Sequence, residues 1–521
     1  SSGSSTGSSG STTGTGTGST GSATGSAGSA TGSTGSDAGS GSSGSSGSQS
    51  TGPILITSGP GAYWTTATPT AGTGTATVTV GSTAAQTFQG FGGAFNEDGW
   101  VNLQKLSASD QAKAIDLLFG ADAAHFVFGR IPIGASDYAT SRYTDDEVMS
   151  GTDNSLTSFS ITRDMTDLIP YVKAAMGVNS SLTFWGSPWT PPTWMKTTSG
   201  SANGNSCALV GSTMFDGGCM NNVTANLTTY GQYFVKWIQA YKAQGITISM
   251  VSPQNEPNYA EGYPSCLWDA SLYTTFVGQY LGPALSGASL STEIMLGTNS
   301  NGDSGQDPAV VSAVEANSTA KGLCKVIGLQ WGMLDNFESN PSSFTTYGIP
   351  IWATEHKCGN YPWMTTVTAA TATVPQIAAY DATMAPNDQA YGVESWAYIR
   401  NAIKAGVSTY NAWNMVLDPI GKGNDTVRSW NQDALLVVNN GALVITPAYY
   451  AFRHVSQYVQ PGAVVMGTTG GDALAFKNPD GSIVTVMYNS GSSAAMTTLS
   501  VGGKTVQFSI PANGWATYKN Q

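Results

Sequence analysis

The segment ITISMVSPQNEP, residues 246–257, decides how the rest of the chain is interpreted. Its apolar, β-branched first half predicts a buried β-strand, and Pro257, which offers no backbone N–H to a neighbouring strand, ends it. Asn255 and Glu256 stand side by side at that end. A carboxylate there is either an ordinary polar strand end or half of an active site, and the fold decides which.

Seven other segments repeat this design, an apolar run that stops at polar or aromatic residues. They are GFGGAF (90–95), HFVFGRIPI (125–133), LTFWGSP (182–188), EIMLGTN (293–299), KVIGLQW (325–331), IPIWATE (349–355) and VSTYNAWNM (407–415). Stretches with helical spacing, such as residues 230–245, lie between them. Eight strands that alternate with helices predict the α/β class and a (β/α)₈ TIM barrel. An open doubly wound sheet is the alternative, but the strand count and the missing G-x-G-x-x-G motif favour the barrel.

The two ends of the chain differ in character from this central part. Residues 1–52 are almost entirely Ser, Gly, Thr and Ala, so they cannot bury enough apolar surface to fold and are predicted to be a disordered tether. Residues 432–521 give short alternating runs separated by turn signals, which predicts an antiparallel β-sandwich. Residues 53–85 contain a strand-like run and are expected to join that sheet. The catalytic barrel is then expected over residues 86–431.

Composition excludes several classes of partner. The net charge is −12, with 20 basic and 32 acidic residues and no cluster of Lys and Arg, so nucleic acid is not an expected partner. No run of 18 apolar residues predicts a transmembrane segment. Few charges and 14 Trp suit an exported monomer that handles neutral polar molecules, outside the cell or tethered to its surface. The chain starts at Ser1, so we expect that any signal peptide is absent from it.

Cysteine and histidine usage argues against a metal site. Of five Cys, Cys207 and Cys219 flank a Gly-rich loop and are the expected disulfide. The odd count leaves at least one thiol outside such a pair. Only three His occur, none with the spacing of a zinc site, so neither a metal nor an organic cofactor is expected.

The ends of the barrel strands carry two glutamates. Working residues of a TIM barrel lie at the C-terminal ends of its strands. Glu256 follows the fourth predicted strand and Glu355 ends the seventh, 99 residues later. Cleavage of a glycosidic bond needs two such carboxyl groups, one protonated to assist the leaving oxygen and one ionised to attack or to activate water. The two glutamates therefore predict that the chain acts on glycosidic bonds.

Six motifs in order resemble glycoside hydrolase family 30. They are QGFGGAFNED (89–98), GRIPIGASDY (129–138), SPWTPPTWMKT (187–197), QNEP (254–257), ATEH (353–356) and AWNMVLDP (412–419). The resemblance implies a TIM barrel with an attached β-sandwich and a retaining β-glycosidase. The family includes glucosylceramidases, endo-β-1,6-glucanases and glucuronoxylan endo-xylanases.

The resemblance also implies roles for individual residues. Glu256 would be the general acid/base and Glu355 the nucleophile, with carboxyl groups about 5–5.5 Å apart. Asn255 would bind the sugar 2-hydroxyl, and Arg130 would steady the nucleophile. The remaining positions that would line the sugar pocket are Asp137, Trp189, Trp331, Trp413 and Asn414.

One departure from the family pattern leaves alternatives open. The family usually has a His-aromatic-Tyr sequence after the sixth strand, whose Tyr contacts the nucleophile, whereas this chain has Gln330, Trp331 and Gly332. We expect a secreted enzyme that cleaves β-glucosidic bonds in a glucan or glycolipid, because AWNMVLDP resembles the glucosylceramidase and β-1,6-glucanase branches. The alternatives are a carbohydrate-binding protein with a degenerate site, or a family member that acts on xylan. Arg130 as an ordinary ion-pair partner, and Trp189 or Trp413 as core residues, are further alternatives.

Overall fold

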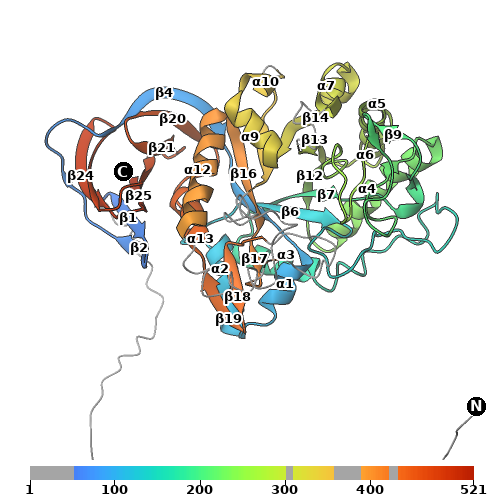
Figure 1. Ribbon diagram of the computed structural model, residues 1–521, viewed down its shortest axis with the longest axis horizontal. Helices are drawn as coiled ribbons and strands as arrows, with labels where there is room; N and C mark the ends of the chain where they lie inside the picture. Colours follow the sequence, from blue (N-terminus) through green and yellow to red (C-terminus); the bar gives the residue numbers. More distant parts are fainter. Residues whose placement is uncertain are drawn as a thin grey trace, which may run out of the picture. The chain divides into compact units, whose positions relative to one another are not determined.

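Eight parallel strands close into a barrel, which confirms the predicted fold class (Figure 1). Each strand pairs with the next one along the chain, and the last pairs with the first. The strands are β5 (Gly90–Ala94), β6 (Phe128–Ile133), β7 (Thr183–Pro188), β12 (Ile248–Val251), β13 (Glu293–Asn299), β14 (Cys324–Gln330), β15 (Ile351–Glu355) and β16 (Val407–Asn414). All eight predicted strands are present, most of them shorter than their apolar runs.

The computed structural model describes residues 52–300, 309–345, 347–356, 389–419, 421 and 432–520. The predicted tether therefore lies outside the described residues, except for Gly52. Within the described part of the chain, helices connect the barrel strands, and one more helix follows the last of these strands. They are α1 (Glu97–Leu103), α2 (Ala108–Phe119), α3 (Leu168–Val178), α4 (Thr224–Ala243), α5 (Ala270–Thr275), a π-helical turn (Phe276–Leu281), α6 (Gly282–Gly287), α7 (Ala309–Glu315), α8 (Ser318–Leu323), α9 (Trp331–Ser339), α10 (Ser342–Thr345), α12 (Gln389–Ala405) and α13 (Pro447–Ser456).

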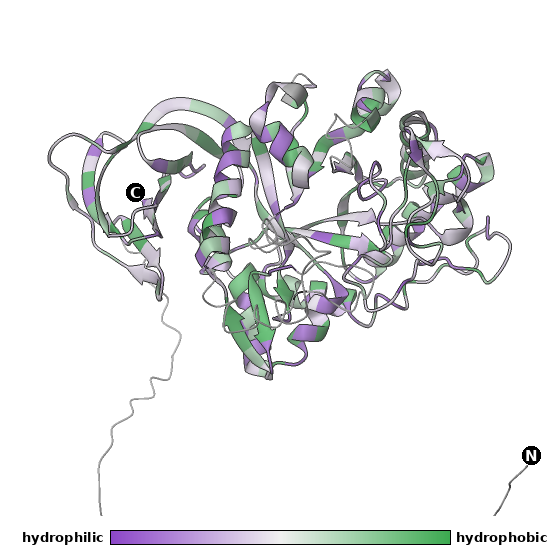
Figure 2. Ribbon diagram, viewed as in Figure 1, coloured by the Kyte–Doolittle hydropathy of each residue, from purple (hydrophilic) through white to green (hydrophobic). Residues whose placement is uncertain are grey.

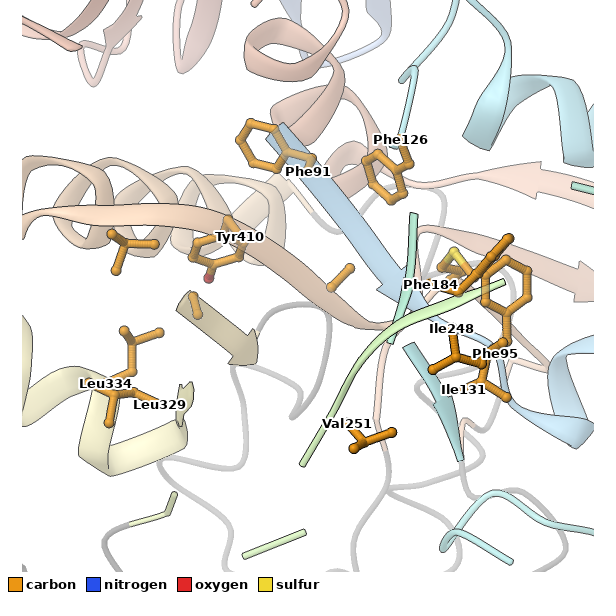
Figure 3. Close-up of a cluster of buried hydrophobic side chains, with 14 of the residues drawn as sticks. Phe91, Phe95, Phe126, Ile131, Phe184, Ile248, Val251, Leu329, Leu334 and Tyr410 are labelled. Atoms are coloured by element: carbon orange, nitrogen blue, oxygen red, sulfur yellow. The ribbon is translucent and has the colours of Figure 1, made fainter. Parts of the chain in front are cut away.

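Alternation along the strands divides the barrel core in two. Phe184 and Val251 belong to the large cluster that the strands form with the helices, part of which Figure 3 shows. Trp185 and Met250, their neighbours on the other face, pack with Trp352 in a separate cluster. Successive side chains of a strand point to opposite faces. The second cluster therefore fills the inside of the barrel, so the barrel is a packed support for its rim and not a channel.

A ten-stranded sheet takes strands from both ends of the chain. From one edge to the other its strands are β2 (Ala62–Thr66), β1 (Ile54–Gly59), β25 (Gly514–Lys519), β22 (Ile483–Asn489), β21 (Asp472–Lys477), β20 (Ala463–Thr469), β4 (Val78–Phe88), β23 (Ala495–Val501), β24 (Lys504–Ile510) and β3 (Thr70–Ala71). Phe508 of β24 stacks on Tyr518 of β25, with ring centroids 6.1 Å apart, although five strands separate the two in the sheet. The sheet therefore folds over its own core as a sandwich, and strands before the barrel join it as expected.

The boundary of this sandwich differs from the expected residue 432. Two strands of the segment that follows, β18 (Leu436–Asn439) and β19 (Ala442–Ile445), pair with β17 (Val416–Leu417) in a separate three-stranded sheet. Figure 2 shows this apolar hairpin in green below the barrel strands. Helix α13 follows, and the sandwich strands resume only at Ala463. Alternating apolar residues predict a strand but do not say which sheet it joins.

Helices α12 and α13 connect the barrel to the sandwich. Both ring nitrogens of His454 are within 2.8 Å of hydroxyl oxygens on sandwich strands, those of Thr517 and Ser58. Burial lowers the pKa of His454 to about 3, so the ring is neutral and bridges the two parts by hydrogen bonds. Arg400 of α12 adds an ion pair with Asp472.

The predicted disulfide between Cys207 and Cys219 is present. Cys266 and Cys324 are buried thiols, and Cys358 lies outside the described residues. Among the helices of the described residues, none is long and apolar enough to cross a membrane.

Candidate active site

Glu256 is held on the barrel rim by the backbone on both sides of its strand. The Asn255 N–H donates to Pro188 O of β7 at 2.7 Å, and the Glu256 N–H donates to Thr298 O of β13 at 3.0 Å. Glu256 has a φ of 48°, in the left-handed region that a non-glycine residue adopts only when its surroundings impose it. This turn places its carboxyl group at the end of the strand, where only 5% of the residue is exposed.

Glu355 is the last residue of β15 and is bound by a cation and an indole. Its Oε2 forms an ion pair with Arg130 Nη1 from β6. Its Oε1 accepts a hydrogen bond from Trp331 Nε1 at 2.8 Å. Arg130 is fully buried, and Ser187 Oγ accepts from its Nε at 3.1 Å and from its Nη2 at 3.0 Å. The ion pair therefore has a fixed geometry away from solvent.

Asn255 and Gln330 connect the two carboxyl groups. Asn255 Oδ1 accepts from Arg130 Nη2 at 2.6 Å and from Gln330 Nε2 at 3.2 Å. The same Gln330 nitrogen donates to Glu256 Oε1 at 2.9 Å. A continuous chain of hydrogen bonds therefore runs from Glu355 through Arg130, Asn255 and Gln330 to Glu256.

The surroundings of the two carboxyl groups are unequal. Burial, first, and the charge of Glu355, second, raise the pKa of Glu256 to about 8, against the opposing effects of the hydrogen bond from Gln330 and the charge of Arg130. Burial also raises the pKa of Glu355, but the Arg130 charge and two direct hydrogen bonds to its charged form oppose that rise. Glu256 is therefore the group that holds a proton at neutral pH, and Glu355 is the one stabilised as an anion.

Three tryptophans surround the Arg130 guanidinium. Its Cζ lies 4.3 Å from the ring centroid of Trp189, 5.0 Å from that of Trp185 and 5.6 Å from that of Trp413. Trp189 and Trp413 stack on each other with centroids 5.5 Å apart, and each is 1% exposed. Both rings contact the cation that forms the ion pair with Glu355.

The other predicted pocket residues take different positions around the pair. Asp137 is buried, and its charge is one cause of the raised pKa of Glu256. Asn414 donates to Gln432 Oε1 at 2.7 Å and accepts from Asn96 Nδ2 at 3.3 Å. Trp331 is half-buried and packs against the cluster that contains Trp189 and Trp413. Arg130, Asn255 and Trp331 therefore belong to the hydrogen-bond network of the two glutamates, whereas Asn414 bonds to Asn96 and Gln432.

Three residues that hold the pair were not among the predicted site residues. Ser187 binds the Arg130 guanidinium, Gln330 binds Glu256, and Thr298 Oγ1 donates to Asn255 Oδ1 at 3.3 Å. Each lies near the C-terminal end of a barrel strand, so the rule that selected the glutamates applies to them as well. Short polar side chains at strand ends gave too weak a signal in the sequence to be selected.

The described residues contain no group of three or more His, Cys, Asp or Glu arranged to hold a metal ion. The side chains of the site offer acid–base and nucleophilic chemistry of their own. The site has a protonated carboxyl group and a carboxylate bound to a buried cation, connected by one hydrogen-bond chain. Such a pair suits the transfer of a proton together with nucleophilic attack.

Comparisons with known proteins show the family of this chain. The sequence profile of the glycosyl hydrolase family 30 TIM-barrel domain matches residues 88–459, and that of the family 30 β-sandwich domain matches residues 462–518. The endo-1,6-β-D-glucanase BGN16.3 of Trichoderma harzianum is 29% identical over 451 residues, 83% of this chain and 84% of that protein. The lysosomal acid glucosylceramidase of Mus musculus is 26% identical over 433 residues, 80% of this chain and 77% of that protein. The solved structure of the endo-β1,6-glucanase BT3312 superimposes with a TM-score of 0.69 at 22% identity, over 90% of this chain and 98% of that one.

Proposed function

The chain belongs to glycosyl hydrolase family 30, and we propose that it cleaves β-glucosidic bonds with retention of configuration, Glu355 acting as the nucleophile and Glu256 as the acid and base. The observation that carries this proposal is the unequal treatment of the two carboxyl groups. Arg130 and Trp331 stabilise the anion of Glu355, while burial favours the protonated form of Glu256.

In the first step the Glu256 proton passes to the glycosidic oxygen while a Glu355 oxygen attacks the anomeric carbon. The bond from that carbon to the leaving oxygen breaks, and a glycosyl ester of Glu355 forms. In the second step the Glu256 carboxylate takes a proton from water, whose oxygen attacks the same carbon and displaces Glu355. Two inversions give net retention.

The charge of Glu355 prepares Glu256 for both roles. That charge raises the pKa of Glu256 in the free enzyme and so favours the acid. It disappears when Glu355 becomes an ester, so the pKa of Glu256 falls in the intermediate and the base is favoured. The same distance between the carboxyl groups, which we expect to be about 5–5.5 Å, serves both steps.

We assign the remaining site residues to sugar recognition. Three donors occupy Asn255 Oδ1, those of Arg130, Gln330 and Thr298, so the amide nitrogen of Asn255 is the end that donates to the sugar 2-hydroxyl. The Asp137 carboxylate accepts from a sugar hydroxyl. Trp189, Trp331 and Trp413 form the apolar wall of the sugar site, and Asn414 supports that wall.

Polymeric β-glucan is the first candidate substrate, and glucosylceramide is the second. The two curated relatives described above carry these two activities in their names. The test is a product analysis with β-1,6-glucan, glucosylceramide and glucuronoxylan offered side by side. We expect glucose or gluco-oligosaccharides from at least one of the first two, first released as the β-anomer in NMR spectra. Activity confined to glucuronoxylan would contradict the proposed substrate, and first release of the α-anomer would contradict the mechanism.

A binding protein without turnover has no specific observation in its favour. The sequence argument for it was the lack of the family tyrosine beside Glu355. The Trp331 indole donates to Glu355 in the structure, so a donor does contact the proposed nucleophile.

We also propose that the protein acts outside the cytoplasm, as a secreted or surface-tethered enzyme. The disulfide between Cys207 and Cys219 supports this location, because such bonds persist in oxidising compartments. The test is mass spectrometry of protein alkylated as it is harvested from the producing cells. The disulfide-linked peptide is expected in the exported fraction, and free thiols at both positions would contradict the location.

A further inference from the structure

Two consecutive residues where β14 meets α9 each contact one of the two carboxyl groups. Gln330 Nε2 donates to Glu256 Oε1 at 2.9 Å, and Trp331 Nε1 donates to Glu355 Oε1 at 2.8 Å. Glu256 and Glu355 come from separate strands, whereas their two donors are neighbours in sequence. One short segment is therefore bonded to both members of the pair.

The backbone of this segment explains how neighbours reach the same site. Successive side chains of a strand point to opposite faces, so a continuing strand would direct only one of the two toward the barrel mouth. Gln330 is extended, with φ −147° and ψ 160°, but Trp331 has a φ of 48°. This left-handed conformation is unfavourable for a tryptophan and persists only where surrounding contacts impose it. It turns the chain at the point where both side chains must face the carboxyl groups.

Both donors are fixed by contacts of their own. Thr354 Oγ1 donates to Gln330 Oε1 at 3.3 Å, which leaves the amide nitrogen facing Glu256. Gln330 is fully buried. The Trp331 ring packs against the aromatic cluster that includes Trp189 and Trp413. Neither donor is free to turn away from its carboxyl group without losing these contacts.

We propose that Gln330 and Trp331 are positioning residues for the catalytic pair, Gln330 holding Glu256 and Trp331 holding Glu355. This inference rests on the proposed function, because that function gives the two glutamates their roles. It assigns a second task to Trp331, which the sequence predicts only as a sugar contact. The indole N–H of Trp331 donates to Glu355, while the face of the ring can still contact a bound sugar.

Loss of each hydrogen bond is expected to change a different pKa, because the bond from Gln330 favours the charged form of Glu256 and the bond from Trp331 favours that of Glu355. Among the described residues, the other titratable groups around the pair and its donors are Arg130 from β6, Asp137 from the loop after it, Tyr263, whose hydroxyl interacts with the charge of Glu256, and His356, whose ring lies 5.5 Å from that of Trp331. These stay in place when Gln330 or Trp331 is replaced. Loss of the Trp331 bond therefore raises the pKa of Glu355, and loss of the Gln330 bond raises the pKa of Glu256.

The experiment compares Trp331→Phe and Gln330→Met by the pH profile of kcat/KM on an aryl β-glucoside. In Trp331→Phe we expect the acidic limb, which reports ionisation of the nucleophile, to move up by about half to one pH unit. In Gln330→Met the alkaline limb, which reports the acid, moves up by a similar amount. The plateau falls by about tenfold in each variant.

Trp396→Phe is the matched control. Trp396 is a buried tryptophan of α12 whose Nε1 donates to a carboxylate, Asp472 Oδ1, at 3.2 Å in the sandwich. The Trp396→Phe variant loses an indole-to-carboxylate hydrogen bond outside the site. Its pH profile of kcat/KM is therefore expected to match that of the unsubstituted enzyme in both limbs and in the plateau. Should Trp331→Phe not fold, the indole N–H signal of Trp331 in the unsubstituted protein, followed by NMR, is expected to titrate with the acidic limb.

The possible failures are distinguishable. An unsubstituted enzyme that cleaves no β-glycoside would contradict the proposed function itself. An active enzyme whose limbs stay unmoved in both variants, or move together in each, would contradict the positioning roles alone. An indole signal of Trp331 that is constant across the acidic limb would contradict the bond to Glu355.

Discussion

Two pairs of buried acidic residues in the described part of the chain can be compared, because only one of the two pairs binds a cation. Glu256 follows barrel strand β12, Glu355 ends β15, and both interact with the charge of Arg130. Asp145 and Asp164 lie in the loop between β6 and α3 and are equally buried, at 3% and 0% exposure. Arg163 is next to Asp164 in sequence but forms its ion pair with Glu97.

We call Glu256 and Glu355 the rim pair, and Asp145 and Asp164 the loop pair. In the loop pair, tyrosine hydroxyls take the place of the cation. Tyr143 and Tyr241 donate to the two oxygens of Asp164 at 2.9 and 2.7 Å, and Tyr233 approaches Asp145 Oδ2 at 3.4 Å. Burial raises the pKa of Asp164 to about 7 and that of Asp145 well above its ordinary value. Neutral donors do not stabilise a buried charge enough to offset desolvation.

The comparison separates a pair suited to chemistry from one suited to structure. In the rim pair an arginine favours ionisation of one member, so acid and anion coexist at neutral pH. In the loop pair both members are driven toward the protonated form, so no nucleophile is available. Four predictions sharpen or break this contrast, from the largest expected effect to the smallest.

Glu355→Gln removes the proposed nucleophile while it keeps a side chain of the same shape. We expect kcat to fall by about 10⁴-fold or more, since the covalent route is lost. The measurement is initial-rate kinetics on an aryl β-glucoside. A loss of less than tenfold would show that Glu355 does not attack the sugar.

Glu256→Gln removes the proton donor but leaves the nucleophile. The expected loss is about 10²–10⁴-fold on substrates with a sugar leaving group, because proton transfer contributes that much. An aryl glucoside with an acidic phenol needs little protonation and should lose far less in the first step. Equal losses on both kinds of substrate would assign Glu256 another role.

Arg130→Met makes the rim pair resemble the loop pair, because it removes the cation. The pKa of Glu355 then rises, so the acidic limb of kcat/KM moves to higher pH and the plateau falls by about 10²-fold. Arg130→Lys keeps a charge and should shift the limb less. An acidic limb that Arg130→Met leaves in place would mean that Arg130 only supports packing.

Asp164→Asn tests the loop pair and should leave kcat and KM unchanged. Since its pKa in the folded chain is about 7, above the unfolded value, Asp164 binds a proton on folding at intermediate pH. Its contribution to stability is therefore full at acidic pH and is lost as pH rises to about 7. The asparagine variant should show a flatter fall of Tm over that range in calorimetry. If Tm of the variant falls with pH as steeply as Tm of the unsubstituted protein, a group other than Asp164 causes the pH dependence.

The sequence predicted the barrel and both carboxyl groups because these depend on local patterns. Each strand shows an apolar run, and Glu256 and Glu355 are large polar residues where such runs stop. The sandwich boundary was misplaced because the hairpin from Leu436 to Ile445 has the same alternation as the sandwich strands but pairs with β17.

Apart from Arg130 beside Glu355, which the family resemblance implied, side-chain partners were the part that the sequence did not predict. The hydrogen bond from Trp331 to Glu355 depends on a left-handed residue at the end of β14, and nothing in the letters QWG indicates that turn. Likewise, Arg163 and Asp164 are adjacent in sequence, yet the arginine pairs with Glu97. Three-dimensional neighbours decide which carboxyl group receives a cation.

Covalent trapping tests the central claim most directly. The enzyme is incubated with a 2-deoxy-2-fluoro-β-glucoside that carries a good leaving group, digested, and mapped by mass spectrometry. The account predicts one fluoroglucosyl ester on Glu355, in the peptide that contains ATEH, and none on Glu256. A label on Glu256, or turnover without any covalent species and with an α-product, would contradict it.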